Sequence, residues 1–175
     1  NTKQGSARRS TTYPAASGEQ VRSADKGVLP VGSTALERVL GCGGLPRGRV
    51  VEVWGPGRSA VAAFAEEACL QAKLRVDRIS TMDEVERCLD GNGLVIVDIG
   101  KREFLPTQLR RLTARVHYLD ACLLILNEEP NPAVKYYASV RISTSKLMCG
   151  SGYFVKSVKN KCGPAFISSY LLTEL

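Results

Sequence analysis

The sequence predicts an α/β domain in which helices flank a mostly parallel central sheet. Two apolar runs, residues 94–98 and 121–127, are continuous rather than alternating, which is typical of parallel strands buried on both faces. Residues 45–63 read as a strand, a tight turn and a helix, the kind of unit from which such sheets are built. Segments with apolar residues at helical spacing separate these strands, as a layered α/β fold requires.

Length and composition favour a single domain with its own core. The chain has 175 residues, 44% of them hydrophobic, and no apolar run reaches the length of a membrane span. The six cysteines are scattered singly and the one histidine is His117, so we expect neither a zinc site nor a disulfide scaffold. The formal net charge of +7 fits contact with nucleic acid or an acidic partner, and fits a solubilising surface equally well.

The chain begins with a segment that lacks any apolar period. Residues 1–27 are rich in Ser, Thr, Gly, Ala and Arg, so we expect a flexible basic arm before a core of residues 28–175. The same composition fits the remnant of an organellar targeting peptide. Ser33 is placed to cap the first helix, whose buried stripe is Leu36, Val39 and Leu40, and the glycines from Gly41 to Gly44 end it.

The turn after the strand at residues 50–54 stands where a phosphate-binding loop would be. Such a loop, G-x-x-x-x-G-K-[ST], uses backbone amides and a lysine for phosphate and a hydroxyl for magnesium. Gly55 matches the first glycine, but the last three positions are Ala60, Val61 and Ala62. Val61 supplies no charge, Ala62 no metal ligand, and Ala60 adds a Cβ where the backbone must approach its ligand. We therefore predict a chain that binds no nucleotide cofactor and hydrolyses no ATP.

The remaining elements follow from apolar spacing. We expect helices at residues 60–73 and 83–90, the second ended by residues 91–93, and a third helix with Leu105, Leu109, Leu112 and Val116 on its buried face. The last strand is expected at residues 166–172.

A group of five cations surrounds the third helix. Its members are Lys101, Arg102, Arg110, Arg111 and Arg115. An ordinary solvated helix face explains them. The sharper alternative is contact with nucleic-acid phosphates, which clustered cations neutralise without reading the base sequence.

Three blocks of the sequence resemble the RecA recombinase family, in the family's order. Residues 45–56, LPRGRVVEVWGP, resemble the stretch before the family's ATP loop. Residues 133–141, AVKYYASVR, resemble the stretch after its second DNA-binding loop, and residues 155–166, VKSVKNKCGPAF, its V-K-N-K-x-x-x-P-F strand pair. The resemblance implies a trimmed RecA-like ATPase core.

The resemblance also implies which active-site groups are missing. Asp98 falls where the family holds magnesium, but without the lysine and hydroxyl of the first motif we expect no metal there. Glu128 replaces a glutamine that senses the terminal phosphate, and the following DNA loop shrinks to residues 129–132. The element that carries the family's catalytic glutamate is expected to be absent between residues 73 and 82.

Two lysines of the family's V-K-N-K motif are kept. In the family the active site lies between subunits, and these lysines reach across to the neighbour; they correspond to Lys159 and Lys161. Lys135 and Tyr136 fall at the family's Lys-Phe interface pair. The resemblance thus implies a partner interface in trans, and the alternative is that the lysines simply face solvent from one side of a strand.

These features predict a catalytically inactive RecA-like accessory protein. We expect it to dock on a RecA-type filament, with weak or indirect DNA contact, as an adaptor in DNA damage tolerance that also meets translesion polymerase subunits, resembling the RecA-like factors of bacterial SOS mutagenesis. Its expected place is the bacterial cytoplasm, near the nucleoid and away from membranes.

Two other functions stay open. One is a structural scaffold subunit of a larger complex without a DNA role, for which an organellar matrix is the expected place. The other is a direct single-strand binder, for which Tyr136, Tyr137 and Tyr153 are the aromatic residues near lysines.

Overall fold

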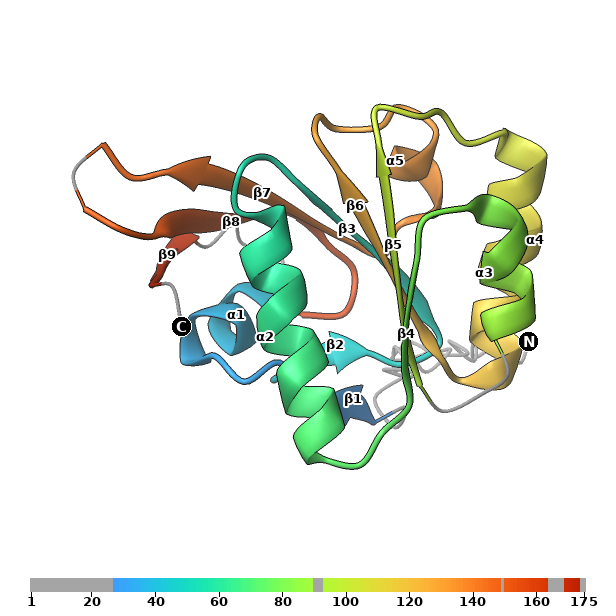
Figure 1. Ribbon diagram of the computed structural model, residues 1–175, viewed down its shortest axis with the longest axis horizontal. Helices are drawn as coiled ribbons and strands as arrows, with labels where there is room; N and C mark the ends of the chain where they lie inside the picture. The colour runs from blue at the N-terminus through green and yellow to red at the C-terminus, as the bar shows by residue number, and fades with distance from the viewer. Residues whose placement is uncertain (1–26, 90–92, 149, 164–168, 174–175) are drawn as a thin grey trace, which may run out of the picture.

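The computed structural model describes residues 27–89, 93–148, 150–163 and 169–173 (Figure 1). The arm predicted before the core therefore lies, except for its last residue, outside the described residues. The described strands are β1 (Val28–Leu29), β2 (Leu45–Pro46), β3 (Arg49–Trp54), β4 (Val76–Ile79), β5 (Leu94–Gly100), β6 (Cys122–Asn127), β7 (Val140–Lys146), β8 (Tyr153–Asn160) and β9 (Ser169–Leu172). The described helices are α1 (Thr34–Leu40), α2 (Arg58–Gln71), α3 (Met82–Cys88), α4 (Pro106–Leu119) and α5 (Val134–Tyr137).

The main sheet has the strand order β4-β5-β6-β3-β7-β8-β9. The first five of these strands run parallel, and β8 and β9 extend the sheet in antiparallel fashion. The mostly parallel α/β fold predicted from the sequence is confirmed. Because β5 and β6 are central and parallel, they are covered on both faces, which explains their continuous apolar sequences.

Helices cover the two faces of the sheet separately. On one face α1 and α2 pack on residues such as Val51, Val53 and Leu124. On the other face α3, α4 and α5 pack on residues such as Val95, Leu123 and Ile125 (Figure 1). The carboxyl ends of the parallel strands meet at one edge of these layers, where loops meet and side chains from several strands converge.

The antiparallel pair β7–β8 contains a β-bulge. Ile142 pairs with Ser157, whereas the preceding Arg141 pairs with Lys159, so Val158 is an extra residue in β8. If Val158 were paired as in a regular strand, the alternation of buried Val155 and Ser157 would direct Lys159 into the core. The bulge instead places Lys159 on the same face of the sheet as Arg141.

The structure corrects one expectation about the sheet. We expected the element after residue 73 to be absent, but β4 forms there and pairs with β5 at the sheet edge. Strand β4 has only four residues of mixed polarity, so the sequence predicts it weakly. The hydrogen bonds that define this strand come from its parallel partner β5. Ser80 and Thr81, not an acid, follow the carboxyl end of β4.

Several element boundaries also differ from the expectations. Leu105 is 61% exposed, because it precedes α4 rather than lying on the buried face with Leu109, Leu112 and Val116. Ser33 occupies the N-cap position of α1 without a side-chain hydrogen bond, while Gly41 ends that helix in the left-handed conformation, as expected. The stop predicted at residues 91–93 and the first part of the last predicted strand lie mostly outside the described residues.

Five cysteines are described, and all are free of disulfides. Cys69 and Cys122 are buried in the sheet core, where burial raises the pKa of Cys69 to about 11 and that of Cys122 further. In the described part of the chain no group of three or more His, Cys, Asp or Glu side chains is arranged to hold a metal ion, and no helix has the length and hydropathy of a membrane span.

Candidate functional site

The connection between β3 and α2 is short and tightly packed. Helix α2 begins at Arg58, two residues before the predicted start, so only Gly55, Pro56 and Gly57 link the strand to the helix. Residues that a phosphate-binding loop would keep outside the helix are wound into its first turn. We call residues 55–58 the closed loop.

Two amides of the closed loop already have partners inside the chain. The Gly57 amide donates to Thr144 Oγ1 at 2.9 Å, and the Arg58 amide donates to the Gly55 carbonyl at 3.3 Å. The Thr144 hydroxyl in turn donates to the Trp54 carbonyl at 2.8 Å. Thr144 therefore ties the end of β3 to the start of α2, and both amides are unavailable to a phosphate.

Two positions of this loop require glycine, because a Cβ atom at either of them would collide with a residue of β7 or β8. Gly55 has φ +96°, and a Cβ there would lie 2.2 Å from the Thr144 carbonyl oxygen. A Cβ on Gly57 would lie 2.6 Å from Cγ of Tyr153. The first motif glycine is thus retained for packing against β7, which is a structural role that requires no ligand.

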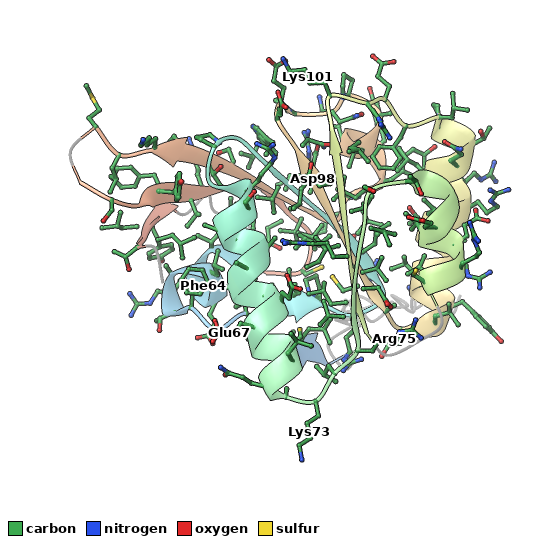
Figure 2. All side chains as sticks on the ribbon, viewed as in Figure 1. Phe64, Glu67, Lys73, Arg75, Asp98 and Lys101 are labelled. Atoms are coloured by element: carbon green, nitrogen blue, oxygen red, sulfur yellow. The ribbon has the colours of Figure 1, made fainter. Side chains whose placement is uncertain are left out.

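Asp98, at the position where the family holds magnesium, lies beside a cation of the same chain. Arg58 Nε lies 3.9 Å from Asp98 Oδ2, and Arg58 Nη1 donates to the Gly55 carbonyl at 3.4 Å. Asp98 Oδ1 also accepts the Gly100 amide at 3.1 Å. Figure 2 shows Asp98 and Lys101 toward the upper end of the sheet, with Lys73 and Arg75 at the lower end. The positive charge beside Asp98 comes from the chain itself.

A buried polar network lies next to the closed loop. Glu52, at the middle of β3, is fully buried and accepts hydrogen bonds from the Asn127 side chain and the Asn131 amide, each at 2.8 Å. Its other carboxylate oxygen pairs with Arg141, whose guanidinium stacks 4.9 Å from the Trp54 ring centre. A buried carboxylate needs such compensation, because desolvation of an unpaired charge is costly. We call these residues the Glu52 network.

The Glu52 network fixes the segment that leads to α5. Asn131 Oδ1 accepts the amides of Ala133 and Val134 at 3.0 and 3.3 Å, which caps the start of the helix. Neither Glu52 nor Arg141 stands out as a functional residue in the sequence. In the sequence, Glu52 and Arg141 each lie between two apolar residues of a strand. This pattern indicates a buried ion pair only when the two strands are known to be neighbours.

The structure brings three of the four expected interface residues together. Lys159 Nζ donates to the Lys135 carbonyl at 2.7 Å, and the Lys161 amide donates to the Ser139 carbonyl at 2.9 Å. Burial, followed by the charges of Lys161, Arg141 and Lys135, lowers the pKa of Lys159. Within the described residues no acid forms an ion pair with these ammonium groups. We call Lys135, Lys159 and Lys161 the lysine cluster; Tyr136 lies beside it on α5 and is 77% exposed.

The five cations near α4 have a different environment. Lys101 pairs with Glu128 at 3.4 Å, and Arg111 pairs with Glu86. Arg102 and Arg115 donate to the Ser80 and Leu89 carbonyls at 3.5 and 3.3 Å. Only Arg110 has no ion pair or side-chain hydrogen bond among the described residues. Exposed pairs of this kind are weak, so the solvated helix face and the phosphate contact both stay predictions for these five cations.

The geometry defines the class of protein. A parallel sheet whose strand turns through glycines into a helix, with an acid at the end of a second strand, is the framework of the nucleotide-binding α/β domains. The comparisons with known proteins then narrow this class. The model of the RecA N-terminal domain matches residues 16–108, more than half of the chain, and the chain accordingly belongs to the RecA family.

Individual relatives agree with this assignment. The chain is 30% identical to protein RecA of Heliobacterium modesticaldum, in an alignment that covers 79% of this chain and 63% of the relative. It is 26% identical to protein RecA of Methylococcus capsulatus, over 81% of this chain and again 63% of the relative. The chain thus spans less than two thirds of the length of these relatives.

A solved structure shows the same fold. The crystal structure of the RadB recombinase superposes with a TM-score of 0.64 at 15% sequence identity, over 83% of this chain and 96% of that chain. The RecA-like core predicted from the sequence blocks is confirmed.

Proposed function

We propose that this chain is a catalytically inactive RecA-like accessory protein that docks on a RecA-type recombinase filament through the lysine cluster. The observation that carries the proposal is the concentration of Lys135, Lys159 and Lys161 without an ion-paired acid among the described residues. Like charges held together cost stability unless a negative group approaches them. A partner's bound nucleotide would supply that group, since cations near phosphoryl oxygens stabilise developing negative charge.

The closed loop supports the inactive half of the proposal. The amides of Gly57 and Arg58 are already hydrogen-bonded, and Arg58 provides the charge beside Asp98. Ala60, Val61 and Ala62 lack the charge and the hydroxyl that phosphate and magnesium require. The adaptor role in DNA damage tolerance and translesion synthesis rests on the resemblance to RecA-like accessory factors.

The test is binding to a RecA-type recombinase assembled on single-stranded DNA, with and without a non-hydrolysable ATP analogue. We expect nucleotide-dependent binding and a change in the partner's ATPase rate. Lys159→Ala combined with Lys161→Ala should weaken binding at least about tenfold and abolish the ATPase effect. Lys101→Ala combined with Arg110→Ala removes the same charge elsewhere and should retain both.

Each alternative has its own outcome. Equal loss in the two double variants would indicate non-specific attraction or DNA contact through the cations near α4. Absence of binding with and without nucleotide would overturn the docking proposal and favour the scaffold function.

A further inference from the structure

The face of β8 and β9 opposite α1 carries exposed apolar side chains. Phe154 and Leu171 are paired directly across the two strands, and each is 47% exposed. Val158, the bulge residue, is 42% exposed on β8. Their strand neighbours Val155 and Leu172 face the other way and are buried beneath α1. We call Phe154, Val158 and Leu171 the apolar stripe.

The apolar stripe is exposed because the helices on its face of the sheet do not extend over β8 and β9. Helices α3, α4 and α5 cover the part of the sheet formed by β4, β5, β6 and β3. Figure 1 shows β7, β8 and β9 extending away from them. Single exposed apolar residues are ordinary, but large ones paired across neighbouring strands form a patch, and such patches mark interaction surfaces.

The polar residues around the stripe define the charge of its partner. Lys156 is exposed on the same face, between Phe154 and Val158 along β8. Across the ladder β7 contributes Ser143 and Ser145 to this face, and no acidic residue lies on the described part of β7 or β8. An apolar centre with an uncompensated cation fits apolar side chains flanked by carboxylates.

The dimensions of the stripe fit a helix. From Phe154 to Val158 the strand advances about 13 Å at the usual rise per residue. Apolar residues at positions i, i+4 and i+7 of a helix span about 10 Å along its axis. A helix laid on this face can therefore seat three such residues on the stripe while acidic residues at its margin approach Lys156.

We propose that the apolar stripe is a second docking surface, which binds an acidic amphipathic helix of a partner protein. The surface is separate from the closed loop, and its central residues are not those of the lysine cluster. An adaptor needs two surfaces of this kind, but the inference does not depend on the recombinase docking, because its evidence is the exposed sheet face.

The test uses the full chain and a fluorescent helical peptide of about 18 residues, with Leu at i, i+4 and i+7 and Glu on both flanks. We expect saturable binding by anisotropy, and binding at least about tenfold weaker when Lys replaces the peptide's Glu. Phe154→Ser combined with Leu171→Ser should reduce affinity at least about tenfold. Lys156→Glu should reverse the preference between the two peptides.

A matched control separates the stripe from general hydrophobicity. Tyr118→Ser combined with Met148→Ser removes two side chains that are 87% and 101% exposed elsewhere, and should leave peptide binding unchanged. All substituted side chains are exposed, and circular dichroism checks that each variant is folded. Equal affinity for both peptides, no binding of either, or equal loss in the control would overturn the proposal.

Other occupants of the stripe give distinct results. A photo-crosslinking residue at position 154 that reacts with residues 1–26 of the same chain would overturn the proposal. So would a dimer in light scattering that Phe154→Ser converts to a monomer. If the proposal holds, the substitutions in the apolar stripe should weaken peptide binding but leave nucleotide-dependent binding to the recombinase filament unchanged. This difference separates the proposal from the proposed function.

Discussion

The closed loop and the lysine cluster differ in whether their charged side chains have partners of opposite charge within the chain. At the closed loop, Thr144 accepts the Gly57 amide and Arg58 lies beside Asp98, so the main-chain amide and the aspartate charge have partners within the chain. In the lysine cluster, the Lys159 ammonium group donates to the Lys135 carbonyl, and no acid of the described structure forms an ion pair with the three lysines. In the first region the charge of Asp98 is balanced by Arg58 of the same chain. The second gains most from an external anion, which is why we place function there.

The largest expected effect tests the Glu52 network, which lies between the two regions. Glu52→Ala leaves Arg141 charged and buried, so we expect a loss of about 3–5 kcal/mol in the free energy of unfolding. Urea unfolding followed by fluorescence of Trp54, the only tryptophan, measures it. The double variant Glu52→Gln with Arg141→Met removes both charges and should recover part of the loss. A single-variant loss below about 1 kcal/mol would mean that the network does not support either region.

A glycine pair tests whether the loop is closed in solution. Gly43→Ala meets no atom within 4 Å but has φ +83°, so it should cost about 1–2 kcal/mol through backbone strain alone. Gly55→Ala adds contact with the Thr144 carbonyl and should cost at least about 1 kcal/mol more. Thermal and urea unfolding of the two variants give the difference. Equal losses would show that the loop stands away from β7.

The pH dependence of Lys159 tests the lysine cluster. Its pKa is lowered in the folded chain relative to the ordinary 10.5, first by burial and then by Lys161. The unfolded chain therefore binds the proton more tightly, and the charged form destabilises the fold at neutral pH. As pH rises through the lowered pKa toward 10.5, this penalty disappears.

Lys159→Gln should accordingly stabilise the chain at pH 7, by about 0.2–1 kcal/mol. The gain should shrink as the pH rises to the ordinary lysine range. Lys156→Gln, on the same strand, serves as the control and should change stability little. A loss of stability at neutral pH in Lys159→Gln would show that the hydrogen bond to Lys135 outweighs the repulsion.

The smallest expected effect is that of nucleotide. A ligand that binds the folded state raises the melting temperature, in proportion to the logarithm of its concentration above Kd. With the closed loop internally bonded, we expect magnesium-ATP to leave the melting temperature unchanged at millimolar concentration, while an active RecA protein shifts under the same conditions. A dose-dependent shift here would show that the loop opens, and would remove the contrast between the two regions.

The sequence predicted the parts of the molecule that rest on local pattern. The apolar runs of β5 and β6, the helix α4 and the losses at Ala60, Val61 and Ala62 are all properties of contiguous residues. The family blocks added the core and the candidate interface, and the structure brings Lys135, Lys159 and Lys161 together.

What the sequence did not predict depends on contacts between distant strands. Glu52 and Arg141 are 89 positions apart, and only the parallel pairing of β3 with β7 makes them neighbours. Likewise, Thr144 closes the loop from another strand. Strand β4 was missed because four mixed-polarity residues carry little signal without their partner β5. The ion pair between Arg111 and Glu86 could not be predicted either, because it joins residues of two different helices, α4 and α3.

The bulge at Val158 makes the facing of Lys159 independent of one residue of strand length in β8. Because side chains alternate with a period of two, an extra residue in a regular strand would reverse the facing of every residue after it, and the bulge prevents this reversal. Deletion of Val158 would therefore remove the bulge and leave Lys159 opposite Arg141, whereas Val158 paired as part of a regular strand would direct the V-K-N-K lysine at position 159 toward the core. Alignments of related chains should accordingly allow a one-residue gap at Val158, since a chain without the bulge residue can still present the matched lysine on the same face.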